Sequence, residues 1–375
     1  MIDVLICGRR KRFCLKRTAI RGGAKTMDQK PKTQKRLELL RNESGAVVVL
    51  VAILLTVFLA IAALAIDVGY LASVRNELQN AADASALAGA RAFAESSSPT
   101  PNWTLAAATA QSSISINKSA GITLTDIEVE TGYWNLARSP LGLQSTGITP
   151  GANDVAAVKA RVNKADGSNS GKVQHWFGAF AGKGSSNVSA DAVAVCGYAG
   201  AAGSGALPAP FAISDCTSDN MDPGETFRIG SAYHYPDDEA GQFTTFLVAL
   251  NQVPAIRDLI TNGNPSPVEI GDNVWIQPGT ENSLYEHNNH PSMNDFAGKT
   301  IVVPVVSRCD LQNRGWAAVS GFACLHVVRA VGASQKYVEA YLVDPCVAPG
   351  TEPGGPNYGA YAPPKLVWGG GPLLP

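Results

Sequence analysis

The residues of this chain best suited to metal binding are His287 and His290, which lie close to Glu286 and Asp295. Imidazole nitrogens and carboxylate oxygens are metal ligands, so this set would hold an ion if the segment folded back on itself. The surrounding letters, EHNNHPSMND, are instead typical of a polar loop. The sequence therefore favours no metal at this position.

Catalytic groups show no recognisable arrangement. His234 has Asp237 and Asp238 close by but no identifiable nucleophile, and no Gly-x-Ser-x-Gly nucleophile elbow occurs in the chain. Residues 298–300 read Gly-Lys-Thr, like the end of a phosphate-binding loop, but the Gly required five positions earlier is Met293. We expect no catalytic residue, no cofactor and no small-molecule substrate.

The element that dominates the sequence is the uncharged 21-residue run at residues 46–66, AVVVLVAILLTVFLAIAALAI. As a helix it would span about 31 Å, which matches the hydrocarbon core of a bilayer. Residues 1–45 carry 13 Lys or Arg against 4 Asp or Glu, a net charge of +9. Basic flanks stay in the cytoplasm, so this run predicts a transmembrane helix with a cytoplasmic N-terminus and an exported C-terminal part. Met27 is an alternative start that keeps a basic flank.

A cleaved signal peptide is the main alternative for this run, because residues 63–65 read Ala-Leu-Ala. Signal peptides have apolar regions of about 7 to 15 residues, shorter than the run found here. Retention is therefore favoured over release after Ala65. The exported part carries 17 basic and 27 acidic residues, a net charge of −10, which argues against nucleic acid as a partner.

Residues 67–95 are rich in Ala and Leu and contain no Pro, which predicts that the helix continues as a stalk. At roughly 100° per residue, small and apolar side chains gather on one face, opposite Asn76. Small residues let helices approach closely, so this face is a candidate contact for a partner helix, and a solvated spacer is the alternative. The candidate face comprises Leu71, Val74, Leu78, Ala82, Ser85 and Gly89.

Five cysteines follow the stalk, in the part expected to reach an oxidising compartment. No two of them are closer than fifteen residues, which disfavours a zinc site and favours disulfides. An odd number leaves one thiol unpaired, and the fifteen ways to form two bridges stay open. The candidates are Cys196, Cys216, Cys309, Cys324 and Cys346.

Residues 41–91 combine Glu-Ser-Gly before the span, Asp-Val-Gly directly after it, and LQNAADASALAGAR at the end. This segment resembles the N-terminal region of the TadG-like proteins of the tight-adherence (Flp) pilus assembly system. A weaker resemblance to the family's downstream domain lies in EVETGYWN, NDVAAVKARV, HWFGAFAG and VSADAVA, at residues 128–135, 153–162, 175–182 and 188–194.

The resemblance implies a bacterial inner-membrane protein that faces the periplasm and takes part in pilus assembly or anchoring, with other pilus-assembly or secretion proteins as partners and without a known reaction. Two family features are missing. With Gly45 as the cut residue of a prepilin site, the required Glu is Leu50, and residues 83–87 lack the second Ser of a von Willebrand A metal motif. A membrane-tethered envelope hydrolase, using the His234 and His287 clusters, and a secreted binding protein are the alternatives.

Strand-like alternation at residues 122–130 and 155–162 predicts half-buried antiparallel strands. Further strands are expected at 227–229, 246–250, 274–277, 300–306, 323–331 and 337–343, and a short helix at 256–261. The fold class is therefore a single-span membrane protein with a stalk helix and a mainly β, or α+β, exported region. The domains expected are a basic leader (1–45), the span (46–66), the stalk (67–95), a TadG-like β domain (96–200), a second β region (201–346) and a Pro/Gly-rich, extended or disordered tail (347–375).

Overall fold

The computed structural model describes residues 43–95, 100–218, 224–230, 239–286 and 290–369. Almost all of the predicted basic leader, residues 96–99 at the start of the predicted TadG-like β domain and the last six residues of the tail therefore lie outside the described residues. Internal contacts divide the chain into two units, residues 1–62 and residues 63–375.

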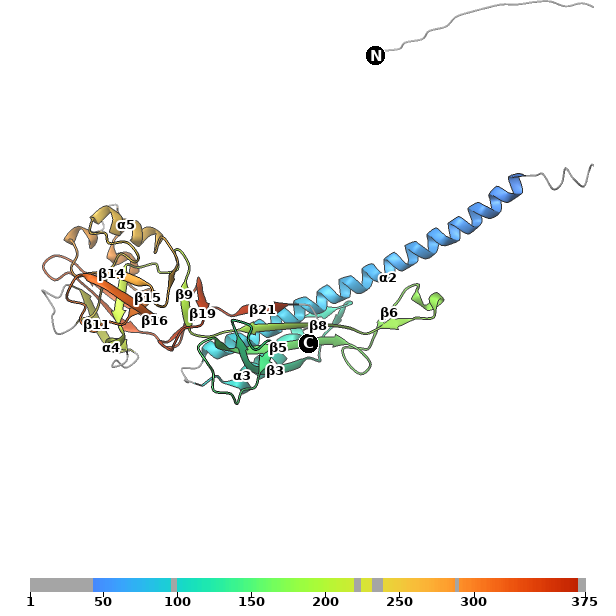
Figure 1. Cartoon of the computed structure of the whole chain (residues 1–375), viewed down its shortest axis with the longest axis horizontal. Coiled ribbons are helices and arrows are strands. Elements are labelled where there is room, and N and C mark those ends of the chain that lie inside the picture. The colour runs from blue at the N-terminus through green and yellow to red at the C-terminus, as the bar shows by residue number, and fades with distance from the viewer. Residues whose placement is uncertain (1–42, 96–99, 219–223, 231–238, 287–289, 370–375) are drawn as a thin grey trace, which may run out of the picture. The chain divides into compact units, whose positions relative to one another are not determined.

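One long helix, α2 (Glu43–Arg91), contains both the apolar run and the stalk, and the 3₁₀ turn η1 (Ala92–Glu95) follows it (Figure 1). Ala and Leu are strong helix formers and no Pro interrupts them, so the helix continues as predicted. Every described large apolar side chain of α2 within the first unit is exposed. In the second unit the same helix becomes buried, first at Asp67 and then regularly from Val74 onward.

The second unit begins with a five-stranded antiparallel sheet in the order β21-β8-β5-β3-β4. The strand expected at residues 155–162 is confirmed within β5. The one expected at 122–130 is interrupted, because the Asn169 side-chain oxygen accepts hydrogen bonds from the backbone N–H groups of Thr125 and Asp126. The strands are β3 (Glu128–Asn135), β4 (Leu143–Gln144), β5 (Asp154–Lys164), β8 (Val188–Val195) and β21 (Lys365–Gly369).

Helices α2 and α3 (Trp103–Ser113) pack on one face of this sheet and enclose a core of Ala, Val and Leu side chains. The side chain of Asn102 caps α3 by accepting from the N–H of Leu105 at 3.0 Å. On the opposite face, Trp134, Ala157 and Val193 are also buried. The centre of the sheet is therefore covered on both faces, whereas the alternation in the sequence predicted strands buried on one.

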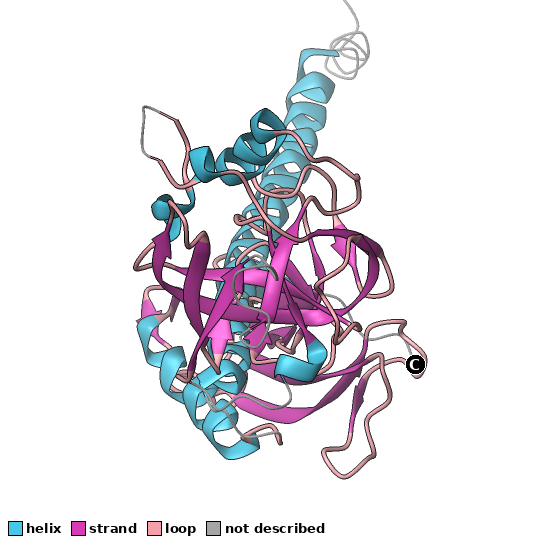
Figure 2. Ribbon diagram, turned by 90° about the vertical axis from the view of Figure 1, so that its left-hand side faces the viewer, coloured by secondary structure: helices cyan, strands magenta, loops and turns pink. Residues whose placement is uncertain are grey.

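A seven-stranded sheet forms the next part of the chain, in the order β10-β15-β16-β14-β12-β11-β17. Additional pairings of β10 with β12 and of β16 with β17 close it on itself, which leaves few exposed strand edges. Strands are the most abundant regular secondary structure in the described chain beyond α2, so the mainly β prediction is confirmed (Figure 2). The strands are β10 (Phe211–Ser214), β11 (Thr226–Gly230), β12 (Glu239–Thr244), β14 (Asn273–Gln277), β15 (Thr300–Val306), β16 (Gly315–Val331) and β17 (Tyr337–Leu342).

One predicted strand of this region is wrong. Residues 246–250 form a turn after β12, in which Phe246 has a positive φ of 56°. The hydroxyl of Thr245 holds the turn: it donates to the carbonyl of Val248 at 2.6 Å and accepts from the N–H of Leu250 at 3.2 Å. The run was apolar because Phe246 is fully buried, and burial alone does not distinguish a strand from a turn.

The C-terminal tail differs from its prediction as well. Residues 365–369, expected to be extended or disordered, form β21, which pairs with β8 at the edge of the first sheet. The seven-stranded sheet thus lies between two strands of the first sheet along the chain, as an insertion. Pro and Gly dominate the composition around KLVWG, so this short apolar strand is not recognisable from composition. Its partner strand is about 170 residues away in the sequence.

The remaining elements are short. Gly-rich residues 197–205, the expected domain boundary, contain β9, which pairs with β13 and β19. The helix expected at 256–261 is confirmed as α5. These elements are α4 (Asp215–Ser218), α5 (Val253–Asn262), β1 (Lys118–Ser119), β2 (Ile122–Thr123), β6 (Val173–Gln174), β7 (Ser185–Ser186), β9 (Ala199–Ala202), β13 (Val268–Glu269), β18 (Cys346–Val347), β19 (Thr351–Pro353) and β20 (Ala360–Tyr361), with 3₁₀ turns η2 (Ile114–Ile116), η3 (Gly178–Ala181), η4 (Asn282–Leu284) and η5 (Met293–Phe296).

Candidate functional site

Helix α2 is the described helix that is long and apolar enough to cross a membrane, judged by length and composition. The apolar side chains of this segment are exposed: the exposed fraction of its Val, Leu, Ile and Phe side chains ranges from 46% at Leu54 to 69% at Val48. Fourteen such side chains fall between residues 46 and 66. A bilayer is the environment in which this surface is stable.

The face of α2 proposed to receive a partner helix is covered by the chain's own fold. Val74, Leu78, Ala82 and Ser85 are at most 1% exposed, Gly89 is buried, and Leu71 is half-buried. All of these except Ser85 and Gly89 belong to, or pack against, the core formed with α3 and the first sheet. Ser113 of α3 donates a hydrogen bond to Ser85, Oγ to Oγ, at 3.1 Å. A second chain therefore finds no exposed surface at the centre of this stripe.

Gly89 marks the closest approach between the stalk and its cover. A Cβ at this position would lie 2.9 Å from the carbonyl oxygen of Ala106, 2.9 Å from the Cβ of Ala110 and 3.0 Å from a methyl of Val158. The small side chains of the stripe let α3 and β5 approach the helix backbone. Periodicity indicated a candidate contact face for a partner helix, with a solvated spacer as the alternative, but it does not state which element covers the face.

Polar contacts also connect the stalk to the sheet domain. Gln79 donates to the backbone carbonyl of Asp191 at 3.0 Å, and Glu77 accepts from the N–H of Ala120 at 2.7 Å. Lys164, 3% exposed, donates to the carbonyl of Asn169 at 2.6 Å. Burial lowers the pKa of Lys164, while the negative charge of Glu77 acts in the opposite direction. These groups position the helix within the domain and leave no free nucleophile among them.

The junction between the span and the domain is made by Asp67, the first residue after the apolar run. Its carboxylate is 5% exposed and accepts hydrogen bonds from the backbone N–H groups of Trp176, at 2.7 Å, and of Phe177, at 3.1 Å. Burial alone would raise the pKa of Asp67, but the backbone donors outweigh it and the pKa is lowered. The Tyr70 ring also meets the Trp176 ring edge-on, with centroids 6.4 Å apart.

The loop that Asp67 binds is the end of the β6–β7 hairpin, HWFGAFAG at residues 175–182. Trp176, Phe177 and Phe180 are exposed by 70%, 41% and 92%. In the sequence, this segment is distinguished only by its resemblance to the family's downstream domain. Three aromatic residues within five positions were the signal that could have singled it out.

The cysteines form two disulfides, as the oxidising environment predicted. Cys216 pairs with Cys309, with 5.4 Å between Cα atoms, and Cys324 pairs with Cys346, with 6.4 Å. The fifth, Cys196, is a buried free thiol whose pKa is raised to about 12 by burial. Pairing was left open by the sequence, since spacing along the chain does not report distance in the fold.

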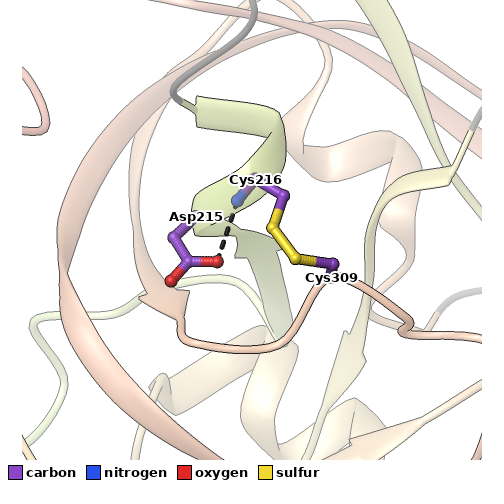
Figure 3. Close-up of side chains that lie close together, drawn as sticks. All are labelled: Asp215, Cys216 and Cys309. Carbon is purple, nitrogen blue, oxygen red and sulfur yellow. Dashed lines mark hydrogen bonds between the residues drawn. A yellow bond between two sulfur atoms is a disulfide. The ribbon is translucent and has the colours of Figure 1, made fainter.

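Asp215 lies next to the first disulfide, and one of its carboxylate oxygens accepts from the N–H of Cys216 at 2.8 Å (Figure 3). The ligand atoms of Asp215, Cys216 and Cys309 fall within 4.8 Å of one another. The thiolate is the form that binds metal, and both sulfurs are bonded to each other here. The arrangement is therefore a structural crosslink with a local carboxylate cap.

A cavity of about 460 Å³ lies beside Cys196, lined by Phe93, Tyr133, Tyr198 and Tyr361 among others. Tyr361 donates a hydrogen bond to Tyr198 between hydroxyl oxygens 3.0 Å apart. Burial raises the pKa of both phenols, so they stay protonated at neutral pH. The described lining residues include the carboxylate of Asp154 but no histidine, and the cavity is a mostly apolar cleft.

In the described part of the chain, the imidazole and carboxylate groups of the His234 and His287 clusters do not form a site. His234, Asp237, Asp238 and His287 lie outside the described residues, and His290 is exposed on a loop. The carboxylate of Asp295 caps η5 by accepting from the N–H of Ser292 at 2.9 Å.

Comparison with protein families gives two matches in the region that contains the stalk and first sheet. Residues 45–92 match the Tad family, described as "Putative Flp pilus-assembly TadE/G-like", and residues 77–194 match the Tad_C family, described as "Putative Tad-like Flp pilus-assembly". The second match ends within β8, before the seven-stranded sheet. No curated protein and no solved structure matches the chain significantly.

Proposed function

We propose that this chain is a membrane-anchored, non-enzymatic scaffold of the Flp pilus-assembly system, because residues 45–92 and 77–194 match two families of Flp pilus-assembly proteins. The main observation in support of the proposal is that the two parts of α2 have different roles. Its N-terminal part is apolar and exposed, and its C-terminal part is the core helix of the matched domain. The chain thus passes from the span to the domain without a linker.

Two features support an N-terminus in the cytoplasm and a sheet region in the periplasm. Thirteen basic residues precede the span, and positive flanks stay on the cytoplasmic side. The sheet region carries two disulfides, which persist in oxidising compartments such as the periplasm. Charge and redox chemistry are independent, and both favour the same orientation.

A scaffolding role follows from how the polar groups are used. Asp67, Glu77 and Gln79 all bind backbone groups of the same chain and position the stalk. The partners proposed are the inner membrane and other pilus-assembly or secretion proteins. Since the chain's own sheet covers the stripe around Leu78, those proteins would contact the outer surface of the sheet domain or the inserted seven-stranded sheet.

Reporter fusions test the orientation. A periplasm-active reporter fused after Pro375 is expected to be active, and the same reporter fused after Lys35 is expected to be silent. The full chain should resist alkaline carbonate extraction and retain residues before Ala46. A soluble chain that starts at Ile66 would instead establish cleavage and release, and the reversed reporter pattern would overturn the orientation.

Partner identity tests the assembly role. After extraction in mild detergent, the tagged full chain is expected to purify with other Flp pilus-assembly proteins, and deletion of the chain should reduce surface pili. A matched tagged membrane protein with an unrelated exported domain is the control. Normal piliation in the deletion strain, together with no specific co-purifying assembly protein, would contradict the proposal.

A further inference from the structure

The β6–β7 hairpin presents aromatic side chains to solvent in a way that no other described part of the sheet region does. Phe180 is 92% exposed and Trp176 is 70% exposed, four positions apart, with Phe177 between them. Soluble surfaces rarely gather large apolar side chains in this way, because exposing them to water is unfavourable. Such a cluster indicates contact with an apolar or interfacial environment.

The loop is held in one conformation by its own hydrogen bonds. The N–H of His175 donates to the carbonyl of Gly184 at 2.9 Å, and the N–H of Lys183 donates to the carbonyl of Gly178 at 3.0 Å. His175 Nδ1 lies 2.8 Å from the carbonyl oxygen of Lys183, and its Nε2 lies 3.0 Å from the hydroxyl of Ser186. The ring therefore connects the two sides of the loop at its base.

The position of the loop follows from Asp67. This residue comes directly after Ile66, the last residue of the apolar run, so it lies where the span leaves the hydrocarbon. Its carboxylate binds the N–H groups of Trp176 and Phe177, and Tyr70 contacts the Trp176 ring. The aromatic cluster is thereby tied to the level of the membrane surface.

The charges of the hairpin fit the same place. Residues 173–186, which form the hairpin, contain Lys183 and no Asp or Glu, while Lys172 before them is paired with the carboxylate of Asp166. Lys183 is exposed next to the aromatic cluster. Trp side chains concentrate at membrane–water interfaces, and basic side chains attract lipid phosphates.

From these observations we propose that residues 175–183 form a second membrane contact, with Trp176, Phe177 and Phe180 inserted among lipid headgroups. This inference rests on the proposed membrane anchoring. Asp67 acts as a positioning residue, because its carboxylate holds the loop at that depth. The two contacts together orient the sheet domain relative to the bilayer, which one helix alone does not do.

A depth measurement on the full chain tests the proposal. In a background with Cys7 and Cys14 replaced by Ser, the variant F180C is labelled with an environment-sensitive dye and reconstituted into phosphatidylethanolamine and phosphatidylglycerol vesicles. Cys196 is buried and does not compete for the label. The dye is expected to emit at shorter wavelength in the vesicles than the same dye does in detergent-free buffer. Lipids that carry a nitroxide at shallow depth in the bilayer should quench its fluorescence strongly.

The matched control is I116C, because Ile116 is 84% exposed but lies further from the membrane. The segment that contains it runs from Ser113, bound to Ser85, to Ala120, bound to Glu77. Glu77 follows Asp67 by ten helical residues, or about 15 Å, which exceeds the thickness of one interfacial layer. Quenching at position 180 should exceed quenching at position 116 several-fold, and D67A should reduce the difference.

The outcomes separate the two proposals. If the chain resists carbonate extraction but the dyes at 180 and 116 are quenched alike, the hairpin contact is refuted and the anchor stands. If the chain is lost to the soluble fraction, the anchor itself is refuted. If position 180 is shielded in native membranes but not in pure lipid vesicles, a protein rather than lipid covers the hairpin, which also overturns the inference.

Discussion

Gly89→Ala and Gly69→Ala form a matched pair that tests the packing of the stalk against its own domain. Both glycines lie inside α2, so either substitution stabilises the helix by about 0.5 to 1 kcal/mol through its intrinsic propensity. At Gly69 a new Cβ would meet nothing within 4 Å. At Gly89 it would lie within 3.0 Å of Ala106, Ala110 and Val158, one of these contacts being to a backbone oxygen.

The propensity term cancels in the difference between the two variants, which leaves the overpacking cost at Gly89. Inserting a methyl group into a closely packed core costs about 1 to 3 kcal/mol. Gly69→Ala is therefore expected to raise the free energy of unfolding, and Gly89→Ala to fall below it by about 1 to 3 kcal/mol. Urea unfolding of the full chain in mild detergent, followed by tryptophan fluorescence, measures this difference. Equal stabilisation by both variants would refute the packing of α3 and β5 on the stalk.

Four further outcomes are expected. Leu78→Asp should lower the free energy of unfolding of the sheet domain by several kcal/mol, because it buries an unpaired charge. Asn76 is exposed, so Asn76→Ala should change stability little, and the resistance of the two variants to protease measures the difference. The Cys216–Cys309 disulfide has a sequence separation of 93 and the Cys324–Cys346 disulfide one of 22. By the chain-entropy model, removing the first should lower the free energy of unfolding by about 1 kcal/mol more than removing the second. Equal losses of this free energy in urea unfolding would contradict that expectation. Cys196 should resist alkylation at pH 8 until urea unfolds the chain, because its pKa is raised to about 12 and it is buried; rapid labelling of folded protein would count against the placement. The lowered pKa of Asp67 means that its carboxylate stabilises the folded state at neutral pH, and that this contribution is lost as the pH falls below the ordinary value of 3.8, so the unfolding difference between wild type and Asp67→Asn should disappear in acid.

Local patterns along the chain were enough to predict its linear organisation. The uncharged run before Asp67 and its basic flank indicated the span, since hydropathy and length depend on neighbouring residues only. The Ala-rich stalk, α5 and strands such as β5 and β15 followed from periodicity for the same reason. Export to an oxidising compartment and an odd cysteine count indicated disulfides with one thiol left over.

Only the tertiary structure decided which surfaces meet. The stripe through Leu78 was recognisable from the sequence as a candidate helix contact, yet its cover consists of α3 and β5 of the same chain, which approach the helix closely at Gly89. Residues 365–369 return to pair with β8, which turns the second sheet from a following domain into an insertion. The pairing of the cysteines and the binding of the Trp176 amide by Asp67 join residues 22 to 109 positions apart. Sequence periodicity records whether a side chain is buried, but a partner so distant in the chain is chosen by the packing of the whole fold.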